Sequence, residues 1–194
     1  MTFNDKSSLL TFLKTRKSAS AKAMGEPGPA PSVLDDILQL ALRVPDHGKL
    51  APWRFIVFEG AARAQVGEAF KARWAQLNPT HGPEALDFQA KLFMRAPVVV
   101  VVVSTAQEHV KIPIWEQQLS AAALSFNLVL AATAHGFDAQ WQSDWVAYDA
   151  LAKATMGVTD AEKVAGIVYI GTSTLPLEDR PRPELASVVT RWVK

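Results

Sequence analysis

The segment PVVVVVVS, from Pro97 to Ser104, decides the fold class. Its uninterrupted run of valines shows no alternation of apolar and polar side chains, which is typical of a β-strand buried on both faces. Such a strand lies inside a layered domain. We therefore expect an α/β fold of the α+β type, in which helices flank a central mixed β-sheet.

Periodicity and turn residues place further elements before and after this strand. Strands are expected at Trp53–Phe58, Phe137–Trp141 and Val164–Gly171. Helices are expected at Ser7–Lys14, Ala61–Gln76, Glu84–Met94, Pro113–His135 and Tyr148–Met156, and another should be capped by Ser32 with Asp35 and stopped by Pro45. With 194 residues and 49% hydrophobic residues, the chain can bury one substantial core, so we expect a single domain over residues 1–194.

The predicted long helix contains an apolar stretch from Leu119 to Ala134. Serine, asparagine and threonine residues interrupt it, and it is shorter than the ~20 residues that a membrane span requires. It is therefore expected to be a buried helix. In a chain this small, a second copy can provide part of the cover, so we predict a homodimer.

Composition argues against several functions. The formal charge is +1 and the basic residues are scattered, which argues against a nucleic-acid partner. The chain has no cysteine, which excludes disulfides, thiolate metal sites and a cysteine nucleophile. The apolar run near the N-terminus is too short for a signal peptide, and we expect a cytoplasmic protein with no membrane partner.

Familiar catalytic motifs are missing from the sequence. It contains no GxGxxG after a strand, no GxxxxGK[ST] and no GxSxG. The histidines are too far apart in sequence for a local metal-binding pair, and no metal site is predicted; they are His47, His81, His109 and His135. An enzyme with this sequence would rely on a bound cofactor for its chemistry.

Basic residues beside turns are candidates for binding a phosphorylated cofactor, because arginine offers a planar pair of donors to phosphate oxygens. The candidates are Arg16, Lys17, Ser18, Arg43, His47, Arg180 and Arg182. Each also has a structural explanation. Cations stabilise helix C-termini, a lone histidine often belongs to a turn or a core, and a charged tail is often only solvated.

Six segments, taken in order, resemble the flavin-dependent nitroreductase family, and in particular its compact bacterial NAD(P)H nitroreductases. They are RKSAS, VPDHGKLAPWRF, KIPIWEQQLSAAALSFNLVLAATAHGF, QWQS, GIVYIGT and RPRPELASVV. Together they span nearly the whole chain. The resemblance implies an intertwined homodimer with two flavin mononucleotide (FMN) sites at the subunit interface.

The resemblance also implies an activity. NADH or NADPH would pass hydride to flavin N5, and the flavin would then reduce a small nitroaromatic or quinone-like acceptor in a ping-pong mechanism. No side chain would act as a catalytic residue. Alternatives are a superfamily relative that uses reduced flavin for dehalogenation or flavin destruction, a non-enzymatic flavin-binding module, and a structural dimer without a cofactor.

Site residues follow from the same resemblance. Flavin contacts would come from one subunit through Arg16, Lys17, Ser18, Trp141, Gln142 and Ser143, and from the other through Arg43 and His47. By position, Arg180 and Arg182 would bind phosphate. The nicotinamide donor would dock near Ala131, Ala132, Thr133, Ala134, His135 and Gly136.

The sequence departs from the wider family at two places. Ser20 stands where many members carry a second arginine, and Lys49, Leu50 and Ala51 replace part of an N-x-Q-P-W pattern. Two polar contacts to the flavin ring are therefore missing from this chain.

Overall fold

The structure is a computed structural model that describes residues 2–193. Its contacts divide the chain into two compact units. The larger unit is Ser18–Leu175, and the smaller combines the chain ends, Met1–Lys17 and Pro176–Lys194. The expectation of one domain over residues 1–194 stays a prediction.

A five-stranded sheet forms the centre of the larger unit. The strands are β1 (Met24–Gly25), β2 (Trp53–Glu59), β3 (Val98–Ser104), β4 (Asp138–Gln142) and β5 (Lys163–Ser173). Their order is β1-β5-β3-β2, and β4 also pairs with β5. The predicted strands are confirmed, with bounds that differ by one or two residues.

The strand directions differ from the mixed sheet that the sequence suggested. Every strand pairing among residues 2–193 is antiparallel. The valine run indicated that the strand is buried on both faces. Burial shows that both faces of the sheet are covered, but it does not fix the direction of the neighbouring strands. Helical connections can return the chain in either direction, so a buried strand does not need parallel neighbours.

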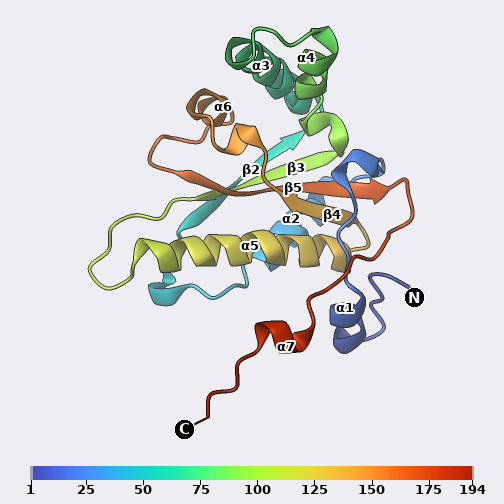
Figure 1. Cartoon of the computed structure of the whole chain (residues 1–194), viewed down its shortest axis with the longest axis vertical. Helices are drawn as coiled ribbons and strands as arrows, with labels where there is room; N and C mark the ends of the chain where they lie inside the picture. The colour runs from blue at the N-terminus through green and yellow to red at the C-terminus, as the bar shows by residue number, and fades with distance from the viewer. Residues whose placement is uncertain (1, 194) are drawn as a thin grey trace. The chain divides into compact units, whose positions relative to one another are not determined.

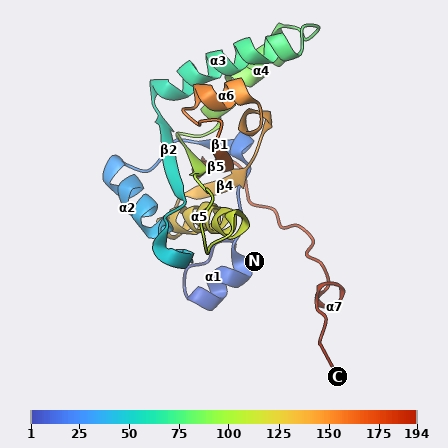
Figure 2. The same cartoon turned by 90° about the vertical axis from the view of Figure 1, so that its left-hand side faces the viewer.

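Helices cover both faces of this sheet. Figures 1 and 2 show α2 and α5 on one side, and α3, α4 and α6 on the other. The helices are α2 (Pro31–Ala41), α3 (Ala61–Leu77), α4 (Pro83–Ala90), α5 (Ile114–Ala134) and α6 (Ala150–Thr155). Single turns of 3-10 helix occur at η1 (Ala21–Ala23), η2 (His47–Lys49), η3 (Phe93–Arg95) and η4 (Trp145–Ala147).

The two layers bury β3 completely, as its sequence predicted. Val98, Val100 and Val102 belong to the core that α2 and α5 share with the sheet. On the opposite face, Phe93 packs edge-on against Tyr169 of β5, with 6.2 Å between the ring centroids. All seven residues of β3 are buried, which confirms the expected layers.

Several helix boundaries correct the sequence prediction. Ser32 does not cap α2, because Pro31 already occupies its first turn and Ala30 is the N-cap. The helix ends at Ala41, before Pro45 is reached. The helix expected at Glu84–Met94 ends at Ala90 and is followed by η3. The helix expected at Tyr148–Met156 is shorter, and η4 precedes it.

The smaller unit contains two short helices, α1 (Leu9–Thr15) and α7 (Leu185–Val188). Ser8 caps α1 by accepting a hydrogen bond from the Thr11 backbone N–H at 3.0 Å. Within residues 2–193, no helix is both long and apolar enough to cross a bilayer.

Candidate functional site

The segment from the end of α2 to the start of η2, residues 40–47, carries Arg43 and His47 and is bound by α5. The Asn127 side-chain amide donates to the carbonyl oxygens of Leu40 at 3.0 Å, Ala41 at 3.2 Å and Arg43 at 3.4 Å. The last carbonyls of a helix have no partner inside the helix. Asn127 therefore caps the C-terminal end of α2 and holds the backbone from which the Arg43 side chain projects.

Ser120 makes the next contact along the same face of α5. Its hydroxyl donates to the Pro45 carbonyl at 2.7 Å and accepts from the Trp53 indole N–H at 3.1 Å. Ser120 itself is only 8% exposed, and the loss of its hydroxyl would remove both of these hydrogen bonds. It joins α5 to the turn and to the start of β2.

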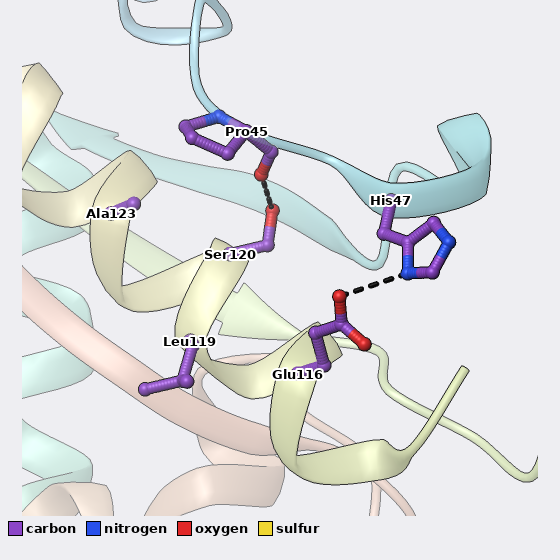
Figure 3. A pocket seen from close by; sticks show the side chains of 6 residues that line it. All are labelled: Pro45, His47, Glu116, Leu119, Ser120 and Ala123. Carbon is purple, nitrogen blue, oxygen red and sulfur yellow. Dashed lines mark hydrogen bonds and ion pairs between the residues drawn. The ribbon is translucent and has the colours of Figure 1, made fainter.

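His47 and Glu116 form the third contact, at a surface cavity of about 270 Å³. His47 Nδ1 lies 2.9 Å from Glu116 Oε1, and the two side chains are 61% and 46% exposed. Figure 3 shows both residues at one end of the cavity and Pro45, Leu119 and Ala123 along its walls. A carboxylate can only accept a hydrogen bond, so Nδ1 donates and Nε2 stays open to a ligand.

The turn that follows has an unusual backbone. Gly48, Lys49 and Ala51 have φ angles of 75°, 55° and 46°, in a region that non-glycine residues seldom adopt. The Asp46 carboxylate holds this conformation by accepting hydrogen bonds from the Leu50 N–H at 3.1 Å and the Ala51 N–H at 2.8 Å. The Asp46 carboxylate therefore stabilises the backbone of this turn.

Trp141 and Gln142, at the end of β4, direct their side chains to opposite faces of the sheet, as neighbouring strand residues do. A Cβ on Gly166 would lie 2.2 Å from Trp141 Nε1 and 3.0 Å from the Ser125 hydroxyl of α5. The Trp141 indole thus lies against Gly166 on the α5 side. One planar ligand cannot contact both side chains of this pair from a single face.

Gln142 faces the aromatic layer around Tyr169. Burial raises the pKa of Tyr169 to about 12, against smaller opposing effects of the Arg95 guanidinium and the Gln142 amide. Within residues 2–193, the Tyr169 hydroxyl has no hydrogen-bond partner. Ser143 is exposed and accepts a hydrogen bond from the Tyr148 hydroxyl at 3.1 Å.

The C-terminal end of α5, expected to lie near the nicotinamide, is largely inside the chain's own core. Ala131, Ala132 and Thr133 are 6%, 0% and 6% exposed. Ala134, His135 and Gly136 are exposed. His135 Nε2 lies 3.0 Å from Asp36 Oδ2 on α2, so only the last three of these six residues offer surface to a ligand.

In the smaller unit, local hydrogen bonds place Arg16 and Lys17 at the end of α1. The Arg16 backbone N–H donates to the Phe12 carbonyl at 2.7 Å, and the Lys17 N–H donates to Asn4 Oδ1 at 2.8 Å. Lys17 and Ser18 are half-buried.

Three arginines from the two chain ends gather in this unit. Burial lowers the pKa of Arg16, and the positive charges of Arg182 and Arg180 lower it further. Asp179 Oδ1 lies 3.2 Å from an Arg182 guanidinium nitrogen and offsets part of the charge. The cluster retains a net positive charge, as a phosphate-binding site requires.

Comparison with known proteins places this arrangement in a family. A sequence model described as "Nitroreductase family" matches residues 13–172. The chain belongs to the nitroreductase family. It is 34% identical over 168 residues to "Putative NAD(P)H nitroreductase YdjA" of Escherichia coli (strain K12), covering 86% of this chain and 88% of that protein. A Haemophilus influenzae protein called "Putative NAD(P)H nitroreductase" is 40% identical over 165 residues, or 84% and 87% of the two chains.

Solved structures show that nitroreductase-like proteins share this fold. A nitroreductase-like family protein from Bacillus cereus superposes with a TM-score of 0.80 at 20% identity, over 96% of each chain. A nitroreductase with bound FMN from Bacteroides fragilis has a TM-score of 0.68 at 21% identity, over 94% of this chain and 97% of that one. The expected family and the nitroreductase-like layered fold are confirmed, and the intertwined homodimer stays a prediction.

For a nitroreductase family member, the structure groups the predicted site residues in an informative way. It brings Arg16, Arg180 and Arg182 together, and it ties Arg43 and His47 to one helix. Glu116 was not predicted from the sequence, and Ser120 and Asn127 were treated only as interruptions of an apolar stretch. Their spacing along α5 was a usable signal, since residues four and seven positions apart share a helix face.

Proposed function

We propose that this protein is an FMN-dependent oxidoreductase that takes hydride from NADH or NADPH and reduces nitroaromatic or quinone-like acceptors. Family membership supports a flavin-dependent oxidoreductase, as do the names of the relatives and the FMN bound in a neighbour of the same fold. The donor preference, the acceptors and the ping-pong order of the reaction belong to the proposal.

The arginine cluster at the chain ends is the observation that carries this proposal. Arg180 and Arg182 repel the positive charge of Arg16, and Asp179 forms an ion pair with Arg182. A phosphate monoester bears nearly two negative charges at neutral pH and would relieve this repulsion. FMN ends in such a phosphate, so the donor set fits its terminal group.

The segment 40–47 would contact the flavin bound by the partner subunit. The Arg43 side chain is exposed and makes no hydrogen bond or ion pair with residues 2–193, so its donors remain open. His47 Nε2 is open as well. When bound, FMN supplies the hydride chemistry, and the task of Arg43 and His47 is to bind and orient it.

For the other predicted flavin and nicotinamide contacts, we propose fewer residues than the sequence suggested. Because Trp141 and Gln142 face opposite sides of the sheet, we propose that only one of these side chains, together with Ser143, reaches the flavin. Lys17 and Ser18 remain candidates beside Arg16. For the nicotinamide donor, the exposed surface at Ala134 to Gly136 is the proposed contact.

Homodimerisation is supported by an exposed apolar stripe on α5. Trp115, Leu119 and Phe126 are 67%, 48% and 40% exposed, and their spacing places them on one side of the helix. Exposed large apolar residues in a row are typical of a protein contact surface. We propose that the partner subunit covers this stripe. A cytoplasmic location remains a prediction.

The visible spectrum of the purified protein tests the function. We expect added FMN to bind, NADH or NADPH to bleach the bound flavin without oxygen, and a nitroaromatic or quinone to restore its colour. With turnover established, initial rates at several acceptor concentrations should give parallel double-reciprocal lines. Intersecting lines would instead indicate a ternary complex.

Other outcomes identify the alternatives. A protein that binds no FMN would be a structural dimer, and one whose bound flavin resists NAD(P)H would be a binding module. Loss of flavin during turnover would indicate flavin destruction. Light scattering should show a dimer with one FMN per chain, and a flavin-loaded monomer would contradict the shared site.

A further inference from the structure

We propose that Glu116, Ser120 and Asn127 of α5 are positioning residues that hold the segment 40–47 in the conformation needed for flavin contact. The inference rests on the proposed function, since the flavin is the ligand that this segment would meet. It assigns a role to three side chains that would not touch the flavin themselves.

The spacing of these residues matches their common target. Glu116, Ser120 and Asn127 stand four and seven positions apart, so they project from one face of α5. All three bind the connection between α2 and η2, which is 69 to 87 residues away in the sequence. Ala123, between them on this face, lines the cavity beside the turn.

Asn127 acts on Arg43 through the backbone. Its amide reaches carbonyl oxygens before and at residue 43, which are the groups that a helix end leaves unpaired. Without this amide, the last turn of α2 would fray, and the backbone at Arg43 would no longer be held in one position. Arg43 would then lose more conformational entropy on binding an anionic or carbonyl group.

Glu116 acts on His47 through the side chain. Its carboxylate accepts from Nδ1 at 2.9 Å, which fixes both the ring orientation and the tautomer. Asp46, Lys49 and the segment 109–112 surround the same turn. The Asp46 carboxylate accepts from backbone N–H groups, and His109 Nδ1 accepts from the Lys111 and Ile112 N–H groups at 3.2 Å, so Glu116 is the side chain paired to His47.

The backbone after His47 shows why such positioning is needed. Lys49 and Ala51 hold positive φ angles, which cost free energy and persist only where surrounding contacts impose them. Gly48 packs so closely that a Cβ there would lie 2.4 Å from Ile112 Cδ1. Asp46 and the close approach of Ile112 hold this turn, and the contacts from α5 fix the segment that leads into it.

Double-mutant cycles on FMN binding test the proposal with the full-length protein. We expect Asn127→Ala and Glu116→Ala each to raise the FMN dissociation constant about 5- to 10-fold, the effect typical of losing one hydrogen-bonding side chain. In an Arg43→Ala background, Asn127→Ala should have almost no further effect. In a His47→Ala background, the same should hold for Glu116→Ala, and Glu116→Gln should restore much of the binding.

Matched controls separate positioning from general stability. Asn78→Ala removes an amide that donates to the Trp74 carbonyl at the end of α3, and Glu84→Ala removes an exposed carboxylate near the start of α4. Both should leave FMN binding unchanged. The ring nitrogen shifts of His47 should report a changed tautomer in Glu116→Ala and an unchanged one in Glu84→Ala.

Full additivity in the two cycles, with unchanged amide hydrogen exchange in residues 43–51, would overturn the positioning role. Failure of the wild-type protein to bind FMN would overturn the proposed function instead. In that case amide hydrogen exchange alone tests the positioning role. Faster exchange of residues 43–51 than in the wild type, seen in Asn127→Ala but not in Asn78→Ala, would support it. The same exchange rates in Asn127→Ala and the wild type would refute it. Glu116 is exposed, so Glu116→Ala keeps the test usable if Asn127→Ala fails to fold.

Discussion

Replacement of Glu162 by glutamine should remove an acid-sensitive part of the protein's stability. The Arg54 guanidinium donates to both Glu162 carboxylate oxygens at 2.7 Å, and the Thr159 N–H donates to one of them at 2.9 Å. The Arg54 side chain also reaches the Gly157 carbonyl at 2.7 Å. Hydrogen bonds from Arg54, opposed by partial burial and aided by Thr159, lower the pKa of Glu162 from 4.5 to about 2.

The size and sign of the effect follow from this shift. A difference of that size corresponds to about 3 kcal/mol, since one pKa unit equals about 1.4 kcal/mol. Arg54 is 38% exposed, so solvent screening reduces the contribution, and we expect about 1 to 2 kcal/mol. Because the folded-state pKa is lowered, this stability is fully present above pH 4.5 and is lost as the pH falls toward 2.

Urea unfolding of the wild type and Glu162→Gln measures this contribution. At pH 7 the variant should be less stable by about 1 to 2 kcal/mol, and at pH 3 the gap should shrink to less than half. Asp160→Asn, in the same turn, is the matched control and should change little at either pH. Equal stability at pH 7, or a gap that does not change with pH, would refute the reasoning.

Four further changes test the site and its support. Arg16→Ala should weaken FMN binding by about 1.5 to 3 kcal/mol in a titration while leaving the circular dichroism spectrum intact, because a charged hydrogen bond is lost; an unchanged dissociation constant would return Arg16 to a helix-end role. Ser120→Ala should lower the free energy of unfolding by about 0.5 to 1.5 kcal/mol, measured in urea, since it removes the hydrogen bonds to the Pro45 carbonyl and the Trp53 indole. Ala51→Gly should raise the free energy of unfolding by about 0.5 to 1 kcal/mol by relieving its positive φ, and a loss of stability would show that the strain is absent. If Arg16 and Arg43 serve one site from different subunits, refolding a 1:1 mixture of the inactive Arg16→Ala and Arg43→Ala dimers should restore about a quarter of wild-type activity, through one intact site in each mixed dimer; only the average of the parents would place both residues in one chain's site or in none.

Local patterns in the sequence determined most elements of the fold. The valine run of β3, the alternation in β2 and the periodicity of α3 and α5 each reflect a side-chain repeat that the backbone geometry imposes. The predicted bounds of these elements agree with the structure to within one or two residues. Among the bounds of the predicted elements, the largest errors occurred at helix ends. The end of α2 depends on the Asn127 amide, which is distant in the sequence.

Local sequence patterns could not predict which of the site residues lie close together in the folded chain. Arg16 and Arg182 are each ordinary cations in the sequence, and only tertiary structure brings them near each other. Neighbouring residues of a strand point to opposite faces of the sheet, so the opposite orientations of the Trp141 and Gln142 side chains could have been predicted. The family resemblance instead led us to expect that both would contact the same flavin.

The sequence by itself therefore determined the kinds of elements, the buried strand and the residue types suited to binding phosphate, because these depend on neighbours within a few positions. Tertiary structure decided the antiparallel order of the strands and the partners of the segment 40–47. Glu116, Ser120 and Asn127 acquire their role only when α5 lies beside that segment. Contacts between residues so far apart depend on how the whole chain packs, and no local pattern encodes them.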